Sequence, residues 1–134
     1  MDPQRQQQLN WLFEQVFIAA QRVHDALGRS LPALTYLSCL AYELEQAGRK
    51  VQRDIAVPII YGQHRVDKGA VIDLVVDGLA AVRVLSVENM TLFHDQEVQT
   101  LLRVSGLPLG IVINFSVPSV RGATHRIMNP APRV

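Results

Sequence analysis

The feature that most constrains the fold of this chain is the stretch from Gly69 to Val87, GAVIDLVVDGLAAVRVLSV. It contains two apolar runs joined at Asp77-Gly78, and Asp-Gly between hydrophobic runs is among the strongest short-range signals of a β-hairpin. The spacing predicts strands at about 70–76 and 79–87. Because both runs are almost continuously apolar, we expect them to be covered on both faces.

Segments on either side of this hairpin alternate between helical and strand patterns. Apolar residues at helical spacing predict helices over about 8–27, 33–48 and 93–105. Strands are expected at 51–61, 109–115 and 124–128, with 62–69 as a polar turn, and Pro58 places the first strand at an edge or interrupts it. The order α-α-β-β-β-α-β-β predicts an α/β sandwich, in which helices flank a mixed β-sheet.

A chain of 134 residues has the length of one domain, and we expect a single domain over 1–134 with a polar lead at 1–7 and a tail at 129–134. Hydrophobic residues make up 49% of the sequence and the mean hydropathy is +0.13, which favours burial of apolar surface against another subunit. Trp11 and Phe17 lie off the centre of the first helix's apolar stripe. They form either a second packed face within the monomer or an aromatic contact with a neighbouring subunit.

The charge of the chain gives little support for electrostatic binding to nucleic acid, because 13 basic residues are balanced by 12 acidic ones and the net charge is +1. Five basic residues near the first strands could still form a basic strip, although such runs are usually a solvated face. They are Arg49, Lys50, Arg53, Arg65 and Lys68.

The single cysteine, Cys39, cannot form an intrachain disulfide and is expected as a small residue of a helix core. The first ten residues, MDPQRQQQLN, lack the apolar run of a signal peptide, and no apolar run has the length of a membrane span. We therefore expect a cytoplasmic protein without a membrane partner.

Several strings, in order, resemble the GxxExxY family, a branch of the PD-(D/E)XK nuclease-like superfamily. The resemblance covers about 17–129. Its matching strings are 19–28 (AAQRVHDALG), 57–61 (VPIIY), 72–78 (IDLVVDG), 109–115 (LGIVINF) and 126–129 (RIMN). This resemblance implies a restriction-endonuclease-like core and, in active members, metal-dependent cleavage of nucleic acid.

The superfamily's catalytic set is an aspartate on one strand and Glu-x-Lys on the next. The resemblance places the aspartate on Asp73, but the glutamate on Arg83 and the lysine on Leu85. A hard divalent ion needs several oxygen ligands, and a positive charge at Arg83 would repel it. We therefore expect no catalytic residues, no metal and no cofactor, with Asp73, Arg83 and Leu85 as positions of a lost site.

Two further family positions fall on helices. The motif that names the family begins at Gly28 and ends at Tyr36, and its glutamate falls on Ala33. A glutamine usual on the helix after the hairpin falls on Glu97, or on Gln99 with a shift of two residues. Four histidines lack the close spacing of a metal motif: His24, His64, His94 and His125.

The pairing register of the hairpin decides whether Asp73 and Arg83 meet. A two-residue turn would pair Val76 with Leu79 and place the two charges on opposite faces. A three-residue loop would pair Val75 with Leu79 and place them on one face as diagonal neighbours, roughly 7–8 Å apart. The resemblance requires the second register, which predicts a buried or half-buried ion pair that costs on the order of 3–5 kcal/mol to break.

The sequence thus favours an inactive nuclease-fold protein that serves as a structural or interaction module and associates with itself in a ring or filament. One alternative is a nucleic-acid-binding protein that keeps the binding surface of the fold. Another is a metal-dependent nuclease with a rearranged site.

Overall fold

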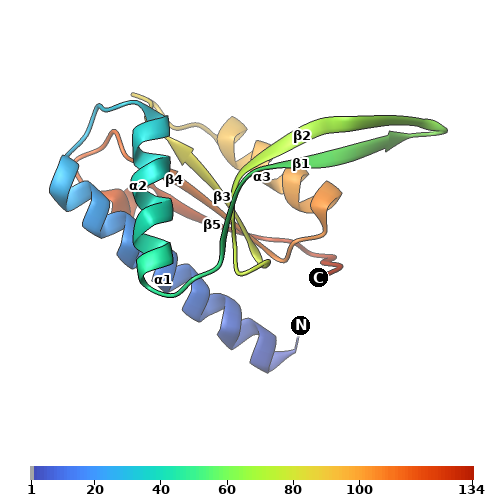
Figure 1. Ribbon diagram of the computed structural model, residues 1–134, viewed down its shortest axis with the longest axis horizontal. Helices are drawn as coiled ribbons and strands as arrows, with labels where there is room; N and C mark the ends of the chain where they lie inside the picture. Colours follow the sequence, from blue (N-terminus) through green and yellow to red (C-terminus); the bar gives the residue numbers. More distant parts are fainter. Residues whose placement is uncertain (1) are drawn as a thin grey trace.

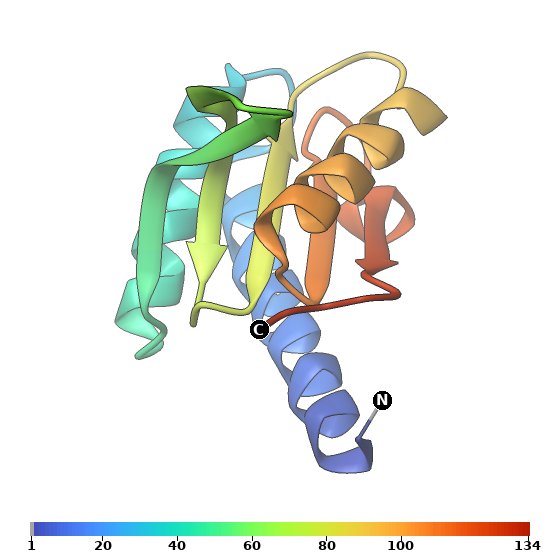
Figure 2. The same cartoon turned by 90° about the vertical axis from the view of Figure 1, so that its right-hand side faces the viewer.

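A computed structural model describes residues 2–134, which form a five-stranded sheet between two layers of helices (Figure 1). The strands lie in the order β1 (Val51–Tyr61), β2 (His64–Val76), β3 (Ala80–Leu85), β4 (Leu109–Asn114) and β5 (Thr124–Met128). In Figure 2, α3 (Leu92–Ser105) lies in front of the sheet, and α1 (Pro3–Leu27) and α2 (Ala33–Gln46) lie behind it. The predicted α/β sandwich is confirmed.

The sheet is mixed, as predicted. β1–β2, β2–β3 and β4–β5 are antiparallel, whereas β3 and β4 are parallel and are joined through α3. A parallel connection needs a long crossover, which the helix supplies. Every residue of β4 is buried, as is every residue of β3 except Arg83, because helices cover both faces of these two strands.

Two apolar clusters hold the layers together. The larger one lies between the sheet and the α1–α2 layer, and it includes Leu9, Val16 and Leu40 together with Leu74 and Ile111 of the sheet. The smaller one lies between α3 and the opposite face of the sheet. Alternate residues of β3 therefore enter different clusters, as the two-residue period of a strand requires.

The turn of the central hairpin is formed by Asp77, Gly78 and Leu79, and Val76 pairs with Ala80 across it. Asp77 and Gly78 both have positive φ, 54° and 66°, which explains the Asp-Gly sequence. Neither of the two predicted registers is the observed one: the loop contains three residues but begins one residue later than expected. This register still keeps Asp73 and Arg83 on one face.

Asp77 also ties this turn to the start of β1. Its Oδ1 accepts a hydrogen bond from the Lys50 N–H at 2.8 Å, and its Oδ2 accepts one from Arg49 Nη1 at 2.9 Å. The Asp77 N–H in turn donates to the Lys50 carbonyl at 2.8 Å. One side chain thus fixes both the turn and the neighbouring strand.

The polar segments contain more regular structure than predicted. α1 begins at Pro3, where Asp2 accepts from the Gln4 N–H, so the expected lead at 1–7 is helical from its third residue; Met1 lies outside the described residues. Its glutamines show no apolar period because this end of the helix is exposed. The predicted turn over 62–69 shrinks to Gly62-Gln63, since β2 already begins at His64. A ribbon exposed on both faces carries no buried stripe, which is why its sequence is polar.

The C-terminal tail packs onto the end of α3. Asn129 is buried, and its Nδ2 donates to the carbonyls of Leu102 at 3.0 Å and Leu107 at 2.9 Å. The Arg133 N–H donates to the Gly106 carbonyl at 2.8 Å. None of the helices in residues 2–134 combines the length and apolarity needed to cross a lipid bilayer.

Candidate functional site

Three charged side chains from different elements meet on the α3 face of the sheet. Leu74 of β2 pairs with Val82 of β3 in an antiparallel ladder. The adjacent pair, Asp73 and Arg83, therefore lies directly across the two strands. Glu97 of α3 lies above them, so Arg83 contacts a carboxylate on each side. The sequence offered Glu97 and Gln99 as alternatives for the family's helical site position, and the structure places Glu97 at this site. Gln99 instead lines separate hollows near β5 and the C-terminal tail.

The ion pairs around Arg83 are long. Its Nη1 lies 3.6 Å from Asp73 Oδ2 and its Nη2 lies 3.9 Å from Glu97 Oε1, both beyond good hydrogen-bond distance. The side chains of Arg83, Asp73 and Glu97 are 33%, 24% and 35% exposed. The predicted half-buried ion pair is present, but at this exposure it contributes closer to about 1 kcal/mol than to the value for a buried pair.

The Nε atom of Arg83 is buried and has no hydrogen-bond partner within residues 2–134. A buried N–H without a partner costs about 1–3 kcal/mol. The carboxylates therefore hold the guanidinium mainly through charge attraction and leave its directional hydrogen bonds unmade.

The pKa of Asp73 is raised above its ordinary value of 3.8, chiefly because burial disfavours the charged carboxylate. Arg83 and the backbone N–H of Val84 act in the opposite direction, whereas the charges of Asp54 and Glu97 raise the pKa further. Burial thus outweighs the ion pair.

Asp54 belongs to this cluster, and the sequence reasoning missed it. Pairing between β1 and β2 runs through Arg53 with Leu74 and Ile55 with Ile72, and it omits Asp54, whose φ is 53°. Aspartate tolerates this left-handed conformation better than the β-branched residues around it. The available signal was an aspartate that interrupts the strand pattern VQRDIAV.

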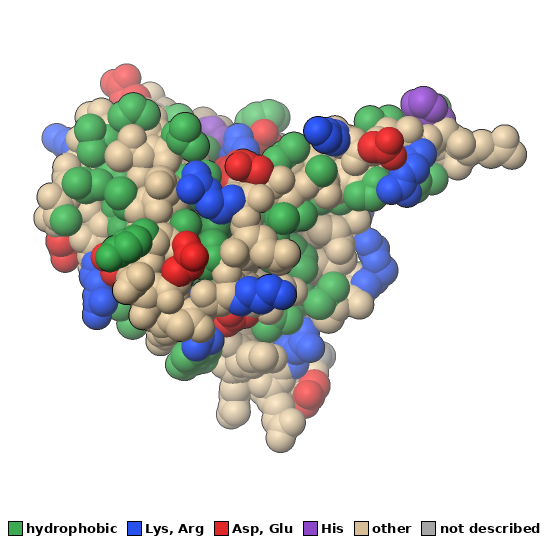
Figure 3. Space-filling model, in the orientation of Figure 1, with side chains coloured by type: hydrophobic (Ala, Val, Ile, Leu, Met, Phe, Trp, Pro, Cys, Tyr) green, Lys and Arg blue, Asp and Glu red, His purple; other side chains and the backbone are tan. Residues whose placement is uncertain are grey.

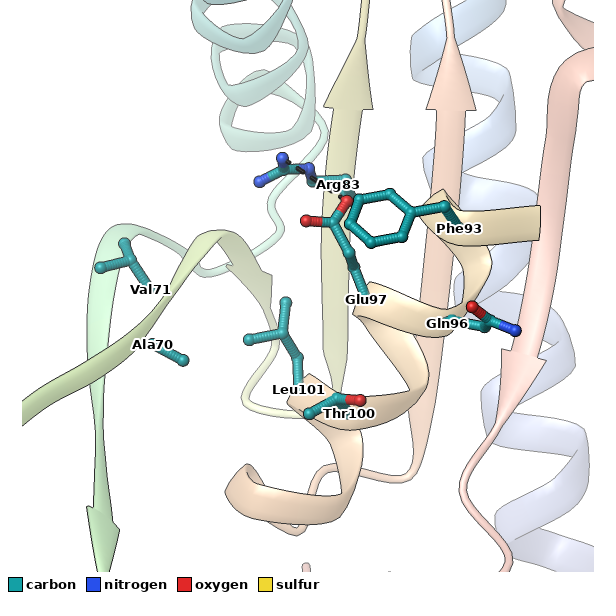
Figure 4. A pocket seen from close by; sticks show the side chains of 8 residues that line it. All are labelled: Ala70, Val71, Arg83, Phe93, Gln96, Glu97, Thr100 and Leu101. Carbon is teal, nitrogen blue, oxygen red and sulfur yellow. Dashed lines mark ion pairs between the residues drawn. The ribbon is translucent and has the colours of Figure 1, made fainter. Parts of the chain in front are cut away.

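An open groove of about 500 Å³ lies beside Arg83, between β2 and α3. Figure 4 shows Arg83 and Glu97 side by side, with the Phe93 ring next to them and Leu101 further along α3. Ala70 and Val71 form the opposite wall. The groove at the position expected for catalysis is therefore lined by apolar side chains, by the polar Gln96 and Thr100, and by the charged pair Arg83 and Glu97.

Leu85, at the expected lysine position, is only 6% exposed and packs in the smaller apolar cluster with Val75, Ala81 and Val112. Ala33 is the first residue of α2. The two ends of the matched motif are in contact: Tyr36 Oη donates to the Gly28 carbonyl at 2.6 Å. This contact needs no catalytic role, because it closes the loop between α1 and α2.

The five basic candidates do not gather into one surface. Arg49 bonds Asp77 and lies over the Trp11 ring, and Arg65 pairs with Asp67 at 2.8 Å. Lys50, Arg53 and Lys68 are exposed at separate points along β1 and β2. In Figure 3 basic and acidic side chains are interspersed over this face.

The two aromatic interface candidates differ in exposure. Trp11 is 47% exposed, with the Arg49 guanidinium carbon 4.7 Å from the centre of its ring. Phe17 is 5% exposed, belongs to the larger core and is covered by Arg121 at 4.2 Å. For Phe17 the structure supports the alternative of a packed face within the monomer.

Three histidines make hydrogen bonds within the chain that account for their positions. His24 Nε2 donates to the Val117 carbonyl at 2.7 Å, and His94 Nδ1 accepts from the Thr91 N–H at the start of α3. His125 Nδ1 lies 2.9 Å from Asp95 Oδ1. Among the residues that the structure describes, no group of three or more His, Cys, Asp or Glu side chains is arranged to hold a metal ion.

The residues present do not fit the divalent ion that the nuclease resemblance implies. Such an ion needs oxygen ligands on the side where Asp73 and Glu97 converge. The guanidinium of Arg83 lies in contact with both carboxylates there and repels a second cation.

Comparison with known proteins gives one match. The sequence profile of the PD-(D/E)XK nuclease superfamily matches residues 10–127, a range that contains β1 to β4, all of β5 except Met128, and all but the first turns of α1. No curated protein and no solved structure matches the chain. The chain belongs to the PD-(D/E)XK nuclease superfamily.

Proposed function

We propose that this protein is a nuclease-fold protein that does not cleave nucleic acid and that acts as a structural or interaction module through self-association. Within the superfamily, we assign it to the GxxExxY branch, and the resemblance of the strings around Gly28, Asp73 and Asn114 supports this assignment. The observation that carries the loss of catalysis is the contact of Arg83 with both Asp73 and Glu97.

Two features of the same site support the loss of activity. An arginine replaces a carboxylate ligand, so the charge near the expected ion changes from attractive to repulsive. At the lysine position, Leu85 contributes to an apolar cluster instead of stabilising developing negative charge. A return of activity would require both positions to change.

Exposed apolar side chains support an interaction role. Large ones lie outside the core on the outer helices, on the hairpin and at the start of α3: Leu34, Tyr42, Ile60, Tyr61, Leu92 and Phe93. Burial of such side chains against a partner would remove apolar surface from water.

A cleavage assay tests the first half of the proposal. Purified protein is incubated with single- and double-stranded DNA and RNA in Mg²⁺ or Mn²⁺, with the Asp73→Ala variant as the matched control. We expect both proteins to leave all four substrates intact. Cleavage that requires the divalent ion and disappears in Asp73→Ala would overturn the loss of catalysis.

Light scattering coupled to size exclusion tests the second half. We expect a mass of several chains that falls on dilution. A monomer at the highest soluble concentration would contradict self-association. A gel shift with nucleic acid that weakens steeply with salt would instead favour the nucleic-acid-binding alternative.

A further inference from the structure

The outer edge of strand β5 has no neighbouring strand within residues 2–134. β5 is the last strand in the sheet order, and β4 is the strand that pairs with it. Figure 2 shows β5 (red) at one edge of the sheet, with α3 in front of the sheet. A strand at an edge presents unpaired main-chain N–H and C=O groups, which are a template for pairing with another chain.

The direction of the main-chain groups in β5 follows from one hydrogen bond just beyond its end. The Asn129 N–H donates to the Pro108 carbonyl, which continues the pairing with β4, at 3.1 Å. Main-chain groups of an antiparallel strand face its partner at alternate residues. Those of Ile127 therefore also face β4, whereas the N–H and C=O groups of Arg126 and Met128 point outward. Both of these residues are exposed.

A hollow of about 560 Å³ runs along this edge between β5 and α3. All five residues of β5 line it, together with Asp95 and Gln99 of α3. A second hollow of about 430 Å³ shares Gln99 and Met128 with the first and continues toward the C-terminal tail. The two hollows together are called the edge groove. A free strand edge beside a helix is a geometry in which an extended peptide can add to a sheet.

The edge groove is basic. Arg126 lines its first hollow, and Arg103 and Arg133 line its second. None of these arginines forms an ion pair with a carboxylate within residues 2–134. Asp95 is the one acidic residue in the lining, and it is paired with His125 at 2.9 Å. From residue 98 to 134 the chain contains four arginines and no acidic residue. Charge complementarity therefore favours an acidic occupant.

Two of these arginines are held in place by their own chain. The Arg126 guanidinium carbon lies 5.6 Å from the centre of the Phe13 ring, and its Nε donates to Met128 Sδ at 3.5 Å. The Arg133 guanidinium donates to the carbonyls of Arg103 and Val104 at 3.3 and 3.1 Å. Side chains that are already ordered lose less conformational entropy when a partner binds.

We propose that an extended acidic segment of a partner protein binds in the edge groove and adds a strand to the sheet beside β5. Its main chain pairs with the outward N–H and C=O groups of Arg126 and Met128. Its carboxylates approach Arg126 at one end of the groove and Arg103 and Arg133 at the other. This site does not depend on self-association, so the peptide titration below and light scattering on the protein alone can fail separately.

Two other occupants fit the edge groove less well. A nucleic acid shares the negative charge, but its backbone has no amide groups to pair with the edge of a strand. A second copy could pair its own β5 antiparallel about Arg126. That arrangement places the two Arg126 side chains directly opposite each other, and like charges in that position are destabilising.

A titration with a model peptide tests the chemistry of the occupant. The probe is a short, acetylated, fluorescein-labelled peptide of alternating glutamate and valine, which favours an extended chain and places its carboxylates on one face. Fluorescence anisotropy should give a Kd on the order of 10–100 μM at low salt, and the affinity should fall as salt is added. The matched peptide with lysine in place of each glutamate should not bind. If the glutamate peptide does not bind at about 1 mM, the proposal is wrong.

Charge reversal locates the binding site. Arg126→Glu should raise the Kd of the glutamate peptide at least about tenfold, as for an interface hot spot. Arg29→Glu, on the exposed loop between α1 and α2, makes the same change of charge away from the edge groove and should bind as the wild type does. An equal loss of affinity in the two variants would show that only the overall charge matters, and would overturn the site.

A proline substitution tests the pairing through the main chain. Met128→Pro removes an outward N–H, and an edge strand tolerates proline where the N–H faces solvent. We expect this variant to lose most of its affinity for the glutamate peptide. Met128→Ala keeps the N–H and should bind within about twofold of the wild type. Circular dichroism verifies that both variants are folded, and equal binding by the two would exclude strand addition.

Amide hydrogen exchange on the wild type gives a test that needs no substitution. Saturation with the glutamate peptide should slow exchange at the N–H groups of Arg126 and Met128, while that of Ile127, which already faces β4, should change little. Protection without this alternation would contradict strand addition. If a labelled oligothymidine binds more tightly than the glutamate peptide and loses its affinity in Arg126→Glu, the groove is a nucleic-acid site and the proposal is wrong.

Discussion

Asp73 and Arg83 face each other across β2 and β3, yet their nearest charged atoms, Oδ2 and Nη1, lie 3.6 Å apart. Despite this pair, the pKa of Asp73 is raised, because burial of the carboxylate outweighs the attraction of the guanidinium. At neutral pH the ionised carboxylate of Asp73 therefore destabilises the folded protein, although it is paired with Arg83.

The first prediction concerns the pH dependence of stability. Since the folded pKa of Asp73 lies above 3.8, its contribution to stability is fully present below that value and is lost as the pH rises through the raised pKa. The side chain of Asp73→Asn does not titrate. The difference in unfolding free energy between this variant and the wild type should therefore shift in favour of the variant as the pH rises through this window. Urea unfolding at a series of pH values measures the difference.

Removal of Arg83 supplies the control for this experiment. Arg83 is the largest influence that lowers the pKa of Asp73, so Arg83→Gln should move the window to higher pH. If Asp73→Asn instead becomes progressively less stable than the wild type as the pH rises, the ion pair outweighs burial.

The second prediction concerns Leu85. Leu85→Lys restores the superfamily's residue type but places an ammonium among apolar side chains, and it should cost about 2–4 kcal/mol in unfolding free energy. Leu85→Met, which conserves volume and apolarity, should cost less than about 1.5 kcal/mol. Chemical denaturation followed by circular dichroism compares them, and equal stability of Leu85→Lys and the wild type would contradict the packing role.

The third prediction concerns Asp77 in the hairpin turn. Asp77→Ala loses two hydrogen bonds and places a residue with poor left-handed preference at φ 54°, so it should cost about 2–3 kcal/mol. Asp77→Asn tolerates that conformation and keeps an acceptor for the Lys50 N–H, so it should cost about 1 kcal/mol. Urea unfolding ranks the two variants, and the reverse order would exclude this explanation.

The fourth prediction concerns Asn129. Its side chain satisfies the carbonyls of Leu102 and Leu107 at the end of α3, so Asn129→Ala should destabilise the protein by about 1–3 kcal/mol. The exposed Asn10→Ala serves as the matched control and should change stability by less than about 0.5 kcal/mol. Hydrogen exchange should show faster opening at the C-terminal turn of α3 in Asn129→Ala alone.

Local patterns in the sequence predicted most of the fold correctly. Asp77-Gly78 marked the turn, the apolar runs marked strands covered on both faces, and Pro58 marked the edge strand. These features depend on backbone conformation and on burial periodicity, which are properties of neighbouring residues. The candidate site at Asp73, Arg83 and Glu97 could be predicted because a family resemblance supplied the pairing of distant positions.

Tertiary structure decided the remaining features. The hairpin loop begins one residue later than predicted, so the partner of Val75 is Ala81 instead of Leu79, and hydrogen bonds from Lys50 and Arg49 hold Asp77 in the turn. Asp54 lies opposite Asp73 because β1 and β2 keep one register from Arg53 to Ile55, and Phe17 is a core residue because it packs in the larger apolar cluster. These outcomes depend on contacts between residues far apart in the chain; a local pattern marks Asp54 as an interruption of its strand but does not identify the residues that it meets. The sequence by itself determined the elements and their order, and the packing between them determined which charges meet and which aromatic side chains remain exposed.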